Sequence, residues 1–135
     1  MIKSEIKIRV LYAHTDKMGI VNNGRYFEFF EAGRNTLLRE IFPYTKLEKI
    51  NYGLPVIEAH ANYLSSAIYD DIIAVKSFLN EMPTVKVKIN YELFVNEKLI
   101  VTGYTIHSFI KLDSLKPARP PKEFLELFKS KFKSG

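Results

Sequence analysis

Residues 14–33, with the sequence HTDKMGIVNNGRYFEFFEAG, place one carboxylate just ahead of a long aromatic-rich segment. Asp16 lies in a polar turn, and Asn22, Asn23 and Gly24 come directly before that segment. A carboxylate can act as a nucleophile or a general base, and the first N–H groups of a helix can stabilise a developing oxyanion. Seven residues separate Asp16 from Asn23, so one loop can bring both to one pocket. These residue types predict a site that faces a bound electrophile.

The same residues also have ordinary structural uses. Thr15-Asp16 is typical of an Asx turn, in which the aspartate bonds only to nearby backbone. Asn22 or Asn23 can cap a helix, and Gly24 lets other groups approach the backbone closely. Turn formation and capping are the more common uses of such residues, so the sequence alone leaves both interpretations open.

The segment after Gly24 is predicted to be a helix. Asn23-Gly24 is also a common hairpin signal, but the apolar residues that follow repeat with helical spacing over a length too great for a strand. This stripe consists of Tyr26, Phe30, Gly33, Leu37 and Ile41. Pro43 follows as a stop signal. Glycine inside a helix costs about 1 kcal/mol relative to alanine, so Gly33 predicts close packing against a sheet.

Alternating apolar and polar residues predict strands on both sides of this helix. The first strand lies near residues 2–10. The others are expected within residues 53–67 and near residues 71–79, 85–95 and 100–111, with a hairpin turn at residues 96–98. The alternating residues that share a face are Ile57, Ala59, Ala61 and Tyr63 in the second of these strands and Ile100, Thr102, Tyr104 and Ile106 in the last. A short amphipathic helix is predicted at the C-terminus from Phe124, Leu127, Phe128 and Phe132. The order of elements favours an α+β fold, one helix against a long antiparallel sheet. Tyr, Phe and Ile on the strand faces favour a dimer that joins two sheets edge to edge.

Composition excludes several classes of function. The 135 residues are 47% hydrophobic and 26% charged, and no cysteine is present for a disulfide, a thiol nucleophile or a Cys-ligated metal. His14, His60 and His107 lack metal-ligand spacing, so no metal and no cofactor is expected. No apolar run reaches the roughly 18 residues of a membrane span. A cytoplasmic protein with no membrane partner is therefore predicted.

The net charge of +5 is concentrated at the C-terminal end. Residues 116–135 hold six Lys or Arg and two Glu, a net charge of +4, which leaves +1 for residues 1–115. A basic tail can bind phosphates of a nucleotide-like ligand or of RNA, but it is more often a solvated end that aids solubility. Nucleic-acid binding is not expected, because Phe128 and Phe132 are the few aromatic residues between the basic ones.

Residues 12–34, residues 53–75 and the strand order together resemble the hotdog-fold acyl-CoA thioesterases, and are most similar to the 4-hydroxybenzoyl-CoA thioesterase family. The resemblance implies a long central helix wrapped by a five- or six-stranded antiparallel sheet. It implies a single domain over residues 1–135, with residues 116–135 as a basic tail that contains a short helix. It also implies an acyl-CoA substrate and a homodimer or homotetramer with active sites at the subunit interface.

The resemblance also assigns roles to particular residues. Asp16 matches the catalytic aspartate, a nucleophile or a general base for water, and Asn23 matches the position whose backbone N–H polarises the thioester carbonyl. The expected substrate-binding set comprises Asn22, Gly24, Tyr26, Glu58, Ser65 and Ser66. Two departures stand out. His14 occupies a position that is acidic in many relatives, and Ser65-Ser66 replaces a more usual pair that ends in proline, which is expected to alter the thioester pocket.

Two alternatives use the same scaffold. A hotdog hydratase or dehydratase needs a histidine base, with a carboxylate on the central helix, and residues 26–38 contain no histidine. That activity is disfavoured. A non-catalytic protein that binds acyl-CoA or another partner without turnover is the remaining alternative. It predicts that loss of the Asp16 carboxylate leaves affinity unchanged.

Overall fold

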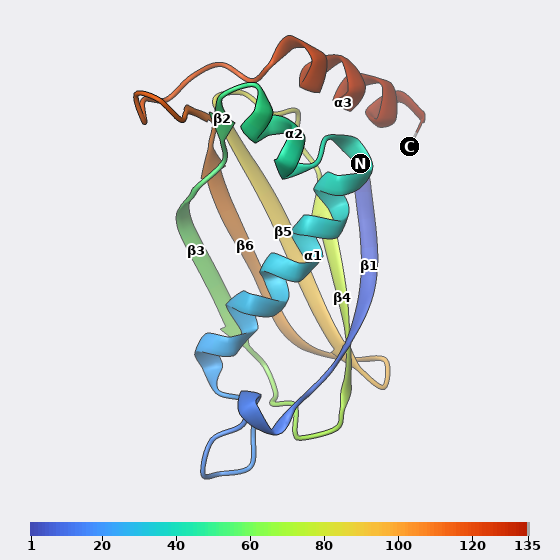
Figure 1. The fold of residues 1–135 in the computed structure, drawn as a ribbon. Helices are drawn as coiled ribbons and strands as arrows, with labels where there is room; N and C mark the ends of the chain where they lie inside the picture. Colours follow the sequence, from blue (N-terminus) through green and yellow to red (C-terminus); the bar gives the residue numbers. More distant parts are fainter. Residues whose placement is uncertain (135) are drawn as a thin grey trace.

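A computed structural model describes residues 1–134 of the chain. One helix lies across a five-stranded antiparallel sheet with the strand order β1-β4-β5-β6-β3 (Figure 1). The sheet is built from β1 (Ile2–Arg9), β3 (Val56–Tyr63), β4 (Ile72–Leu79), β5 (Lys86–Val95) and β6 (Lys98–Ser108), and the helix is α1 (Tyr26–Ile41). The predicted α+β class and antiparallel sheet are confirmed, and so are the limits of the long helix.

The smaller elements lie at the two ends of the sheet. Short 3-10 turns, Tyr12–His14 and Asn23–Arg25, precede α1. The other end carries α2 (Tyr44–Lys49), a two-stranded sheet of β2 (Tyr52–Gly53) and β7 (Ile110–Lys111), and α3 (Lys122–Ser134), as Figure 1 shows. The sequence did not predict α2, β2 or the break between β6 and β7.

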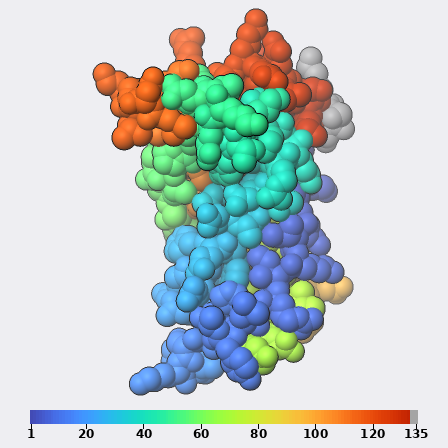
Figure 2. Space-filling model, in the orientation of Figure 1, coloured from blue at the N-terminus to red at the C-terminus, as the bar shows by residue number. Residues whose placement is uncertain are grey.

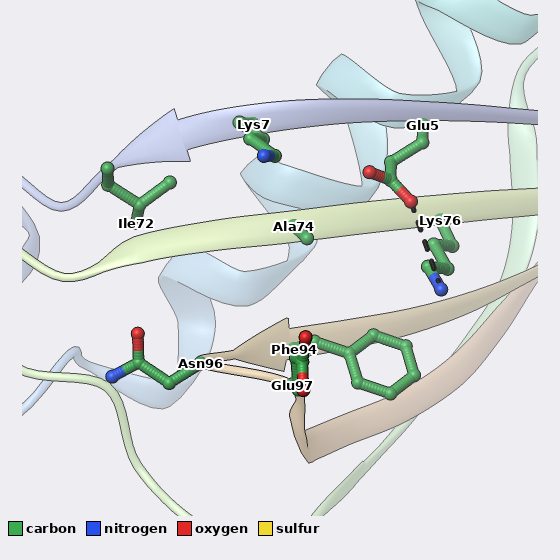
Figure 3. Close-up of a pocket in the computed structure, with 8 residues that line it drawn as sticks. All are labelled: Glu5, Lys7, Ile72, Ala74, Lys76, Phe94, Asn96 and Glu97. Atoms are coloured by element: carbon green, nitrogen blue, oxygen red, sulfur yellow. Dashed lines mark ion pairs between the residues drawn. The ribbon is translucent and has the colours of Figure 1, made fainter.

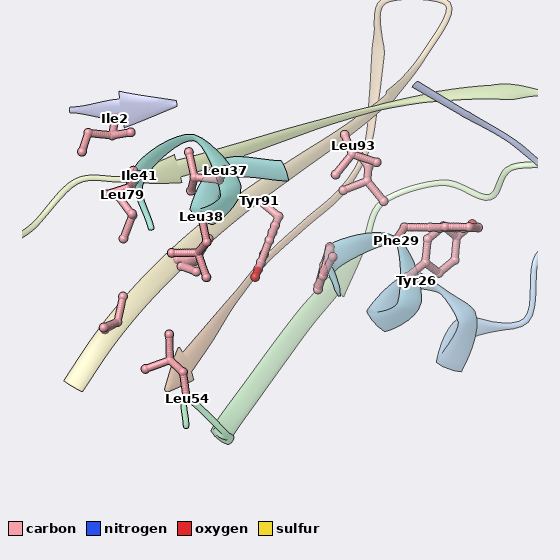
Figure 4. Close-up of a cluster of buried hydrophobic side chains, with 14 of the residues drawn as sticks. Ile2, Tyr26, Phe29, Leu37, Leu38, Ile41, Leu54, Leu79, Tyr91 and Leu93 are labelled. Carbon is pink, nitrogen blue, oxygen red and sulfur yellow. The ribbon is translucent and has the colours of Figure 1, made fainter. Parts of the chain in front are cut away.

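The core lies between α1 and the sheet (Figure 4). Phe30 of α1 stacks on Tyr91 of β5 with ring centroids 4.3 Å apart. The predicted close packing at Gly33 is confirmed, because a Cβ atom there would lie 2.5 Å from Ser77 Oγ and 2.8 Å from Val75 Cγ1. Glycine at this position therefore lets α1 rest directly on β4.

The C-terminal helix packs onto the end of the core. Phe124 and Phe128 of α3 are buried, and Phe124 contacts Phe42 and Phe109 edge to face. Leu127, which was predicted to share the apolar face, is partly covered, with 38% of its surface exposed. Gly135, the last residue of the predicted tail, lies outside the described residues.

A buried chain of hydrogen bonds runs across β5 and β6. Tyr91 Oη lies 2.7 Å from Thr105 Oγ1, Thr105 Oγ1 lies 2.8 Å from His107 Nε2, and His107 Nδ1 lies 3.0 Å from Leu54 O. A carbonyl oxygen only accepts, so Nδ1 of His107 donates. In the neutral imidazole Nε2 then accepts from the Thr105 hydroxyl, which in turn accepts from Tyr91. His107 is thus the structural histidine that the sequence predicted.

This neutral histidine predicts a loss of stability in acid. Burial, helped by the nearby Arg34 charge, lowers the pKa of His107 to about 4, against about 6.5 when unfolded. Between these values the unfolded chain binds a proton that the folded chain does not. The free energy of unfolding should therefore fall as pH drops from about 6.5 to about 4, by on the order of 3 kcal/mol.

Urea unfolding of the wild type and of His107→Gln between pH 7.5 and pH 4 tests this expectation. The glutamine amide can still donate to Leu54 O but does not titrate, so the variant should show a shallower loss. His60→Gln, at an exposed position, should behave like the wild type. Equal slopes for His107→Gln and the wild type would mean that His107 is not the titrating group.

Candidate active site

Asp16 lies on a tight loop at one end of the molecule. Thr15 and Val21 form a bridge, the Asp16 N–H donates to Ile20 O at 3.0 Å, and the Gly19 N–H donates to Asp16 O at 3.0 Å. Gly19 has a φ of +78°, a conformation that favours glycine. The loop therefore holds a fixed shape, and it forms the blue projection at the lower end of the molecule in Figure 2.

The Asp16 carboxylate takes part in the turn. Its Oδ1 accepts the Met18 N–H at 2.8 Å, and the residue is half-buried. This is the Asx turn that the sequence allowed. Oδ2 has no hydrogen-bond partner among residues 1–134. One carboxylate oxygen therefore orders the loop, and the other is available to a ligand.

The helix start has an ordered cap. Asn22 Oδ1 accepts the Gly24 N–H at 3.0 Å, and the Asn22 N–H donates to His14 O at 2.8 Å. A helix start rather than a hairpin is therefore confirmed, and Asn22 caps the 3-10 turn Asn23–Arg25 that leads into α1. The N–H of Asn23 has no acceptor among the described residues. A Cβ atom on Gly24 would meet only Asn22 Oδ1, at 3.4 Å, so that side of the backbone is open.

Tyr26 is linked to the Asp16 loop by hydrogen bonds through Ala67. Its side chain is buried, and its Oη accepts the Ala67 N–H at 3.1 Å. Burial raises the pKa of the Tyr26 phenol, which therefore stays protonated. Ala67 O in turn accepts the Val21 N–H at 2.9 Å. Tyr26 thus fixes the base of the loop through Ala67, and a direct contact with substrate stays a prediction.

Ser65 and Ser66 lie in the segment that follows β3. The Ser65 N–H donates to Ile100 O at 3.1 Å, and its Oγ lies 3.5 Å from Lys98 Nζ. Ser66 is exposed. Neither serine contacts Asp16 or Asn23 in the described chain, so their part in binding stays a prediction.

Glu58 lies on the face of the sheet that is remote from α1. Its Oε2 accepts the Tyr104 hydroxyl at 2.6 Å, and this hydrogen bond raises the pKa of Tyr104. The adjacent residues on β6, Gly103 and Thr105, face α1: Gly103 lies against Phe30, and Thr105 is buried. Side chains alternate along a strand, so Tyr104 and Glu58 point to the opposite side. A single chain does not bring Glu58 together with Asp16.

Tyr63 is a residue of this site that the sequence analysis missed. Its hydroxyl donates to Asn23 O at 2.9 Å. The two residues are 40 positions apart, and the period-two pattern of β3 identified Tyr63 only as an apolar side chain. No local signal in the sequence indicates this contact.

A hollow on the outer face of the sheet lies away from these residues. A cavity of about 630 Å³ on the outer face of the sheet is lined by Glu5, Lys7, Lys76 and Phe94 among others, and Glu5 lies 3.8 Å from Lys76 (Figure 3). It contains none of the predicted site residues.

Within residues 1–134 no group of three His, Asp or Glu side chains could share a metal ion. No helix of this part of the chain is long and apolar enough to cross a membrane.

A long helix packed on a five-stranded antiparallel sheet is the arrangement of the hotdog fold. Residues 10–128 match the thioesterase-like superfamily, and the chain belongs to this family. The chain is similar to a solved DHNA-CoA thioesterase from Staphylococcus aureus, with 32% identity and a TM-score of 0.90, over 99% of this chain and 91% of that one. The resemblance, the fold and the class of thioester hydrolase predicted from the sequence are confirmed.

Two further relatives agree with this assignment. The acyl-CoA thioesterase YbgC of Haemophilus influenzae is 28% identical, over 90% of each chain. A solved 4-hydroxybenzoyl CoA thioesterase, complexed with 4-hydroxybenzoyl CoA, is 17% identical with a TM-score of 0.85, over 94% of this chain and 99% of that one. At this identity the second likeness shows the shared fold alone.

Proposed function

We propose that this protein is an acyl-CoA thioesterase, which uses water to cleave a CoA thioester into a free acid and CoA. The observation that carries the proposal is that one loop and helix start hold both the Asp16 carboxylate, with one oxygen left for a ligand, and the Asn23 N–H, which has no acceptor among the described residues. The relative from Haemophilus influenzae is named an acyl-CoA thioesterase, and the one from Staphylococcus aureus is named a DHNA-CoA thioesterase.

The loop ladder supports a shared target for these two groups. Asp16 pairs with Ile20, and Asn22 pairs with His14, two residues farther along the ladder. At about 3.3 Å per residue this step is roughly 7 Å. A carbonyl group with a contact on each side spans a similar length. The Asn23 N–H, at the positive end of the α1 dipole, would stabilise the oxygen, while Asp16 would address the carbon.

The CoA thioester and water supply all the atoms of the products. In one route an Asp16 oxygen bonds to the acyl carbon, the C–S bond breaks, CoA leaves as the thiol after protonation, and water hydrolyses the mixed anhydride. In the other route Asp16 takes a proton from water, and the water oxygen bonds to the acyl carbon as the C–S bond breaks. Both routes use the same carboxylate and the same N–H donor.

A second copy of the chain would complete the site. Strand β3 is an edge of the sheet, and its residues Ile57 and Tyr63 are 51% and 42% exposed. An unpaired edge with exposed apolar side chains favours pairing with another strand. We propose an antiparallel pair of β3 strands about a two-fold axis. This places the Val56 end of one β3 beside Tyr63 and the Asn23 of the other chain, with a tetramer as a pair of such dimers.

Release of CoA thiol from a panel of aliphatic and aromatic acyl-CoAs tests the proposed function. Steady turnover of at least one substrate, in proportion to the protein concentration, is the expected result. Tight binding of acyl-CoA with no thiol release would instead favour the non-catalytic binding protein. Neither turnover nor binding across the panel would exclude both.

A further inference from the structure

Tyr63 connects the sheet to the start of α1. It is the last residue of β3, and the next two residues are fixed to β6 because the N–H groups of Leu64 and Ser65 both donate to Ile100 O, at 2.8 and 3.1 Å. From this anchored position its hydroxyl reaches Asn23 O at 2.9 Å. The hydroxyl is therefore held by the sheet, not by the loop that it contacts.

The peptide group between Asn23 and Gly24 is held at both ends. Its carbonyl accepts the Tyr63 hydroxyl and the Tyr26 N–H, and its N–H donates to Asn22 Oδ1 at 3.0 Å. The preceding N–H, that of Asn23, is left without an acceptor among the described residues. Because the Asn23–Gly24 peptide group is fixed on both sides, the neighbouring Asn23 N–H points in a defined direction.

We infer that Tyr63 is a positioning residue for the oxyanion donor, an assignment that rests on the proposed thioesterase function. A preorganised donor stabilises the transition state because it need not reorient as charge develops, and loss of such a donor typically costs about 10²–10³-fold in kcat. Tyr63 acts through Asn23 and touches no reacting atom. Its loss leaves the donor present but less constrained, so the expected effect is smaller, roughly 10-fold in kcat.

Tyr63→Phe tests this inference, with Tyr52→Phe as a matched control. Tyr52 makes the same kind of bond elsewhere, since its hydroxyl donates to Arg119 O at 2.9 Å. Both variants remove one hydroxyl bond to a backbone carbonyl and should lower the melting temperature by similar amounts. Only Tyr63→Phe should lower kcat for a hydrolysed acyl-CoA, by roughly 10-fold, with KM changed less than about two-fold.

Several results would overturn the inference. If the wild type hydrolyses acyl-CoA and Tyr63→Phe keeps its full kcat, Tyr63 does not position the donor, and the proposed function stands. A rise in KM alone would make Tyr63 a binding residue. Loss of the native oligomer in Tyr63→Phe, measured by light scattering, would give it a role in assembly instead. If the wild type releases no thiol from any acyl-CoA, the proposed function fails and the inference fails with it.

Discussion

Asp16→Asn is expected to lower kcat for acyl-CoA hydrolysis by at least about 10²-fold while the protein folds normally. An asparagine can neither attack the thioester nor take a proton from water. Its side-chain oxygen can still accept the Met18 N–H, the bond that Asp16 Oδ1 makes at 2.8 Å. The Asx turn and the loop should therefore be retained, which separates the chemical effect from a structural one.

Steady-state thiol release at saturating substrate, together with thermal unfolding, measures both effects. Asp113→Asn makes the same change of charge at an exposed position in a different loop and should leave kcat unchanged. Equal turnover in Asp16→Asn and the wild type would exclude the Asp16 mechanism and direct attention to Glu58 or a histidine. Unchanged acyl-CoA affinity without turnover in either protein would favour the binding-protein alternative.

Ala59→Lys is expected to convert the oligomer to a monomer and to lower kcat/KM by at least about 10²-fold. Ala59 is exposed near the middle of β3, on the side that faces α1. In the proposed two-fold pair of β3 strands, the residues at the middle of each strand lie close to one another. Two lysines would then meet across the interface, and juxtaposed like charges cost several kcal/mol. A monomer would lack the second β3 that borders the site.

Light scattering at micromolar concentration and thiol release on the same samples provide the measurement. Asn80→Lys adds the same charge at an exposed position after β4 and should change neither mass nor activity. An Ala59→Lys protein that keeps its oligomeric mass would place the interface on another surface. A monomeric Ala59→Lys protein with full activity would show that the site is complete within one chain.

The candidate site could be predicted only in part from the sequence. The pattern from Asp16 to Gly24 correctly indicated a turn, a cap and a helix start, because these depend on side-chain bonds between residues two positions apart. Glu58 followed from the resemblance, and the sequence gives no sign that its carboxylate would meet Tyr104 on the far face. That position depends on the register between β3 and β6, which pairs residues 38 to 51 positions apart.

Ile100 shows why the sequence alone could not predict which residues of a strand face the core. The sequence predicts regular alternation of Ile100, Thr102, Tyr104 and Ile106 in the return strand. In the structure the β5–β6 register shifts between Leu93, which pairs with Val101, and Phe94, which pairs with Leu99, so Ile100 is an extra residue. A bulge of this kind interrupts the alternation. Both Ile100 and Val101 are buried, and beyond them Thr105 and His107 form the core side of β6.

The sequence by itself determined the elements whose signals are local. The spacing from Tyr26 to Ile41 specified the long helix, and Gly33 indicated its close contact with the sheet. The tertiary structure alone decided that Tyr63 holds the Asn23 peptide and that the Asn23 N–H has no acceptor among the residues described. The physical reason is that helical periodicity and capping act within a few residues. A hydrogen bond between β3 and the helix start exists only once the sheet has fixed the relative positions of the two segments.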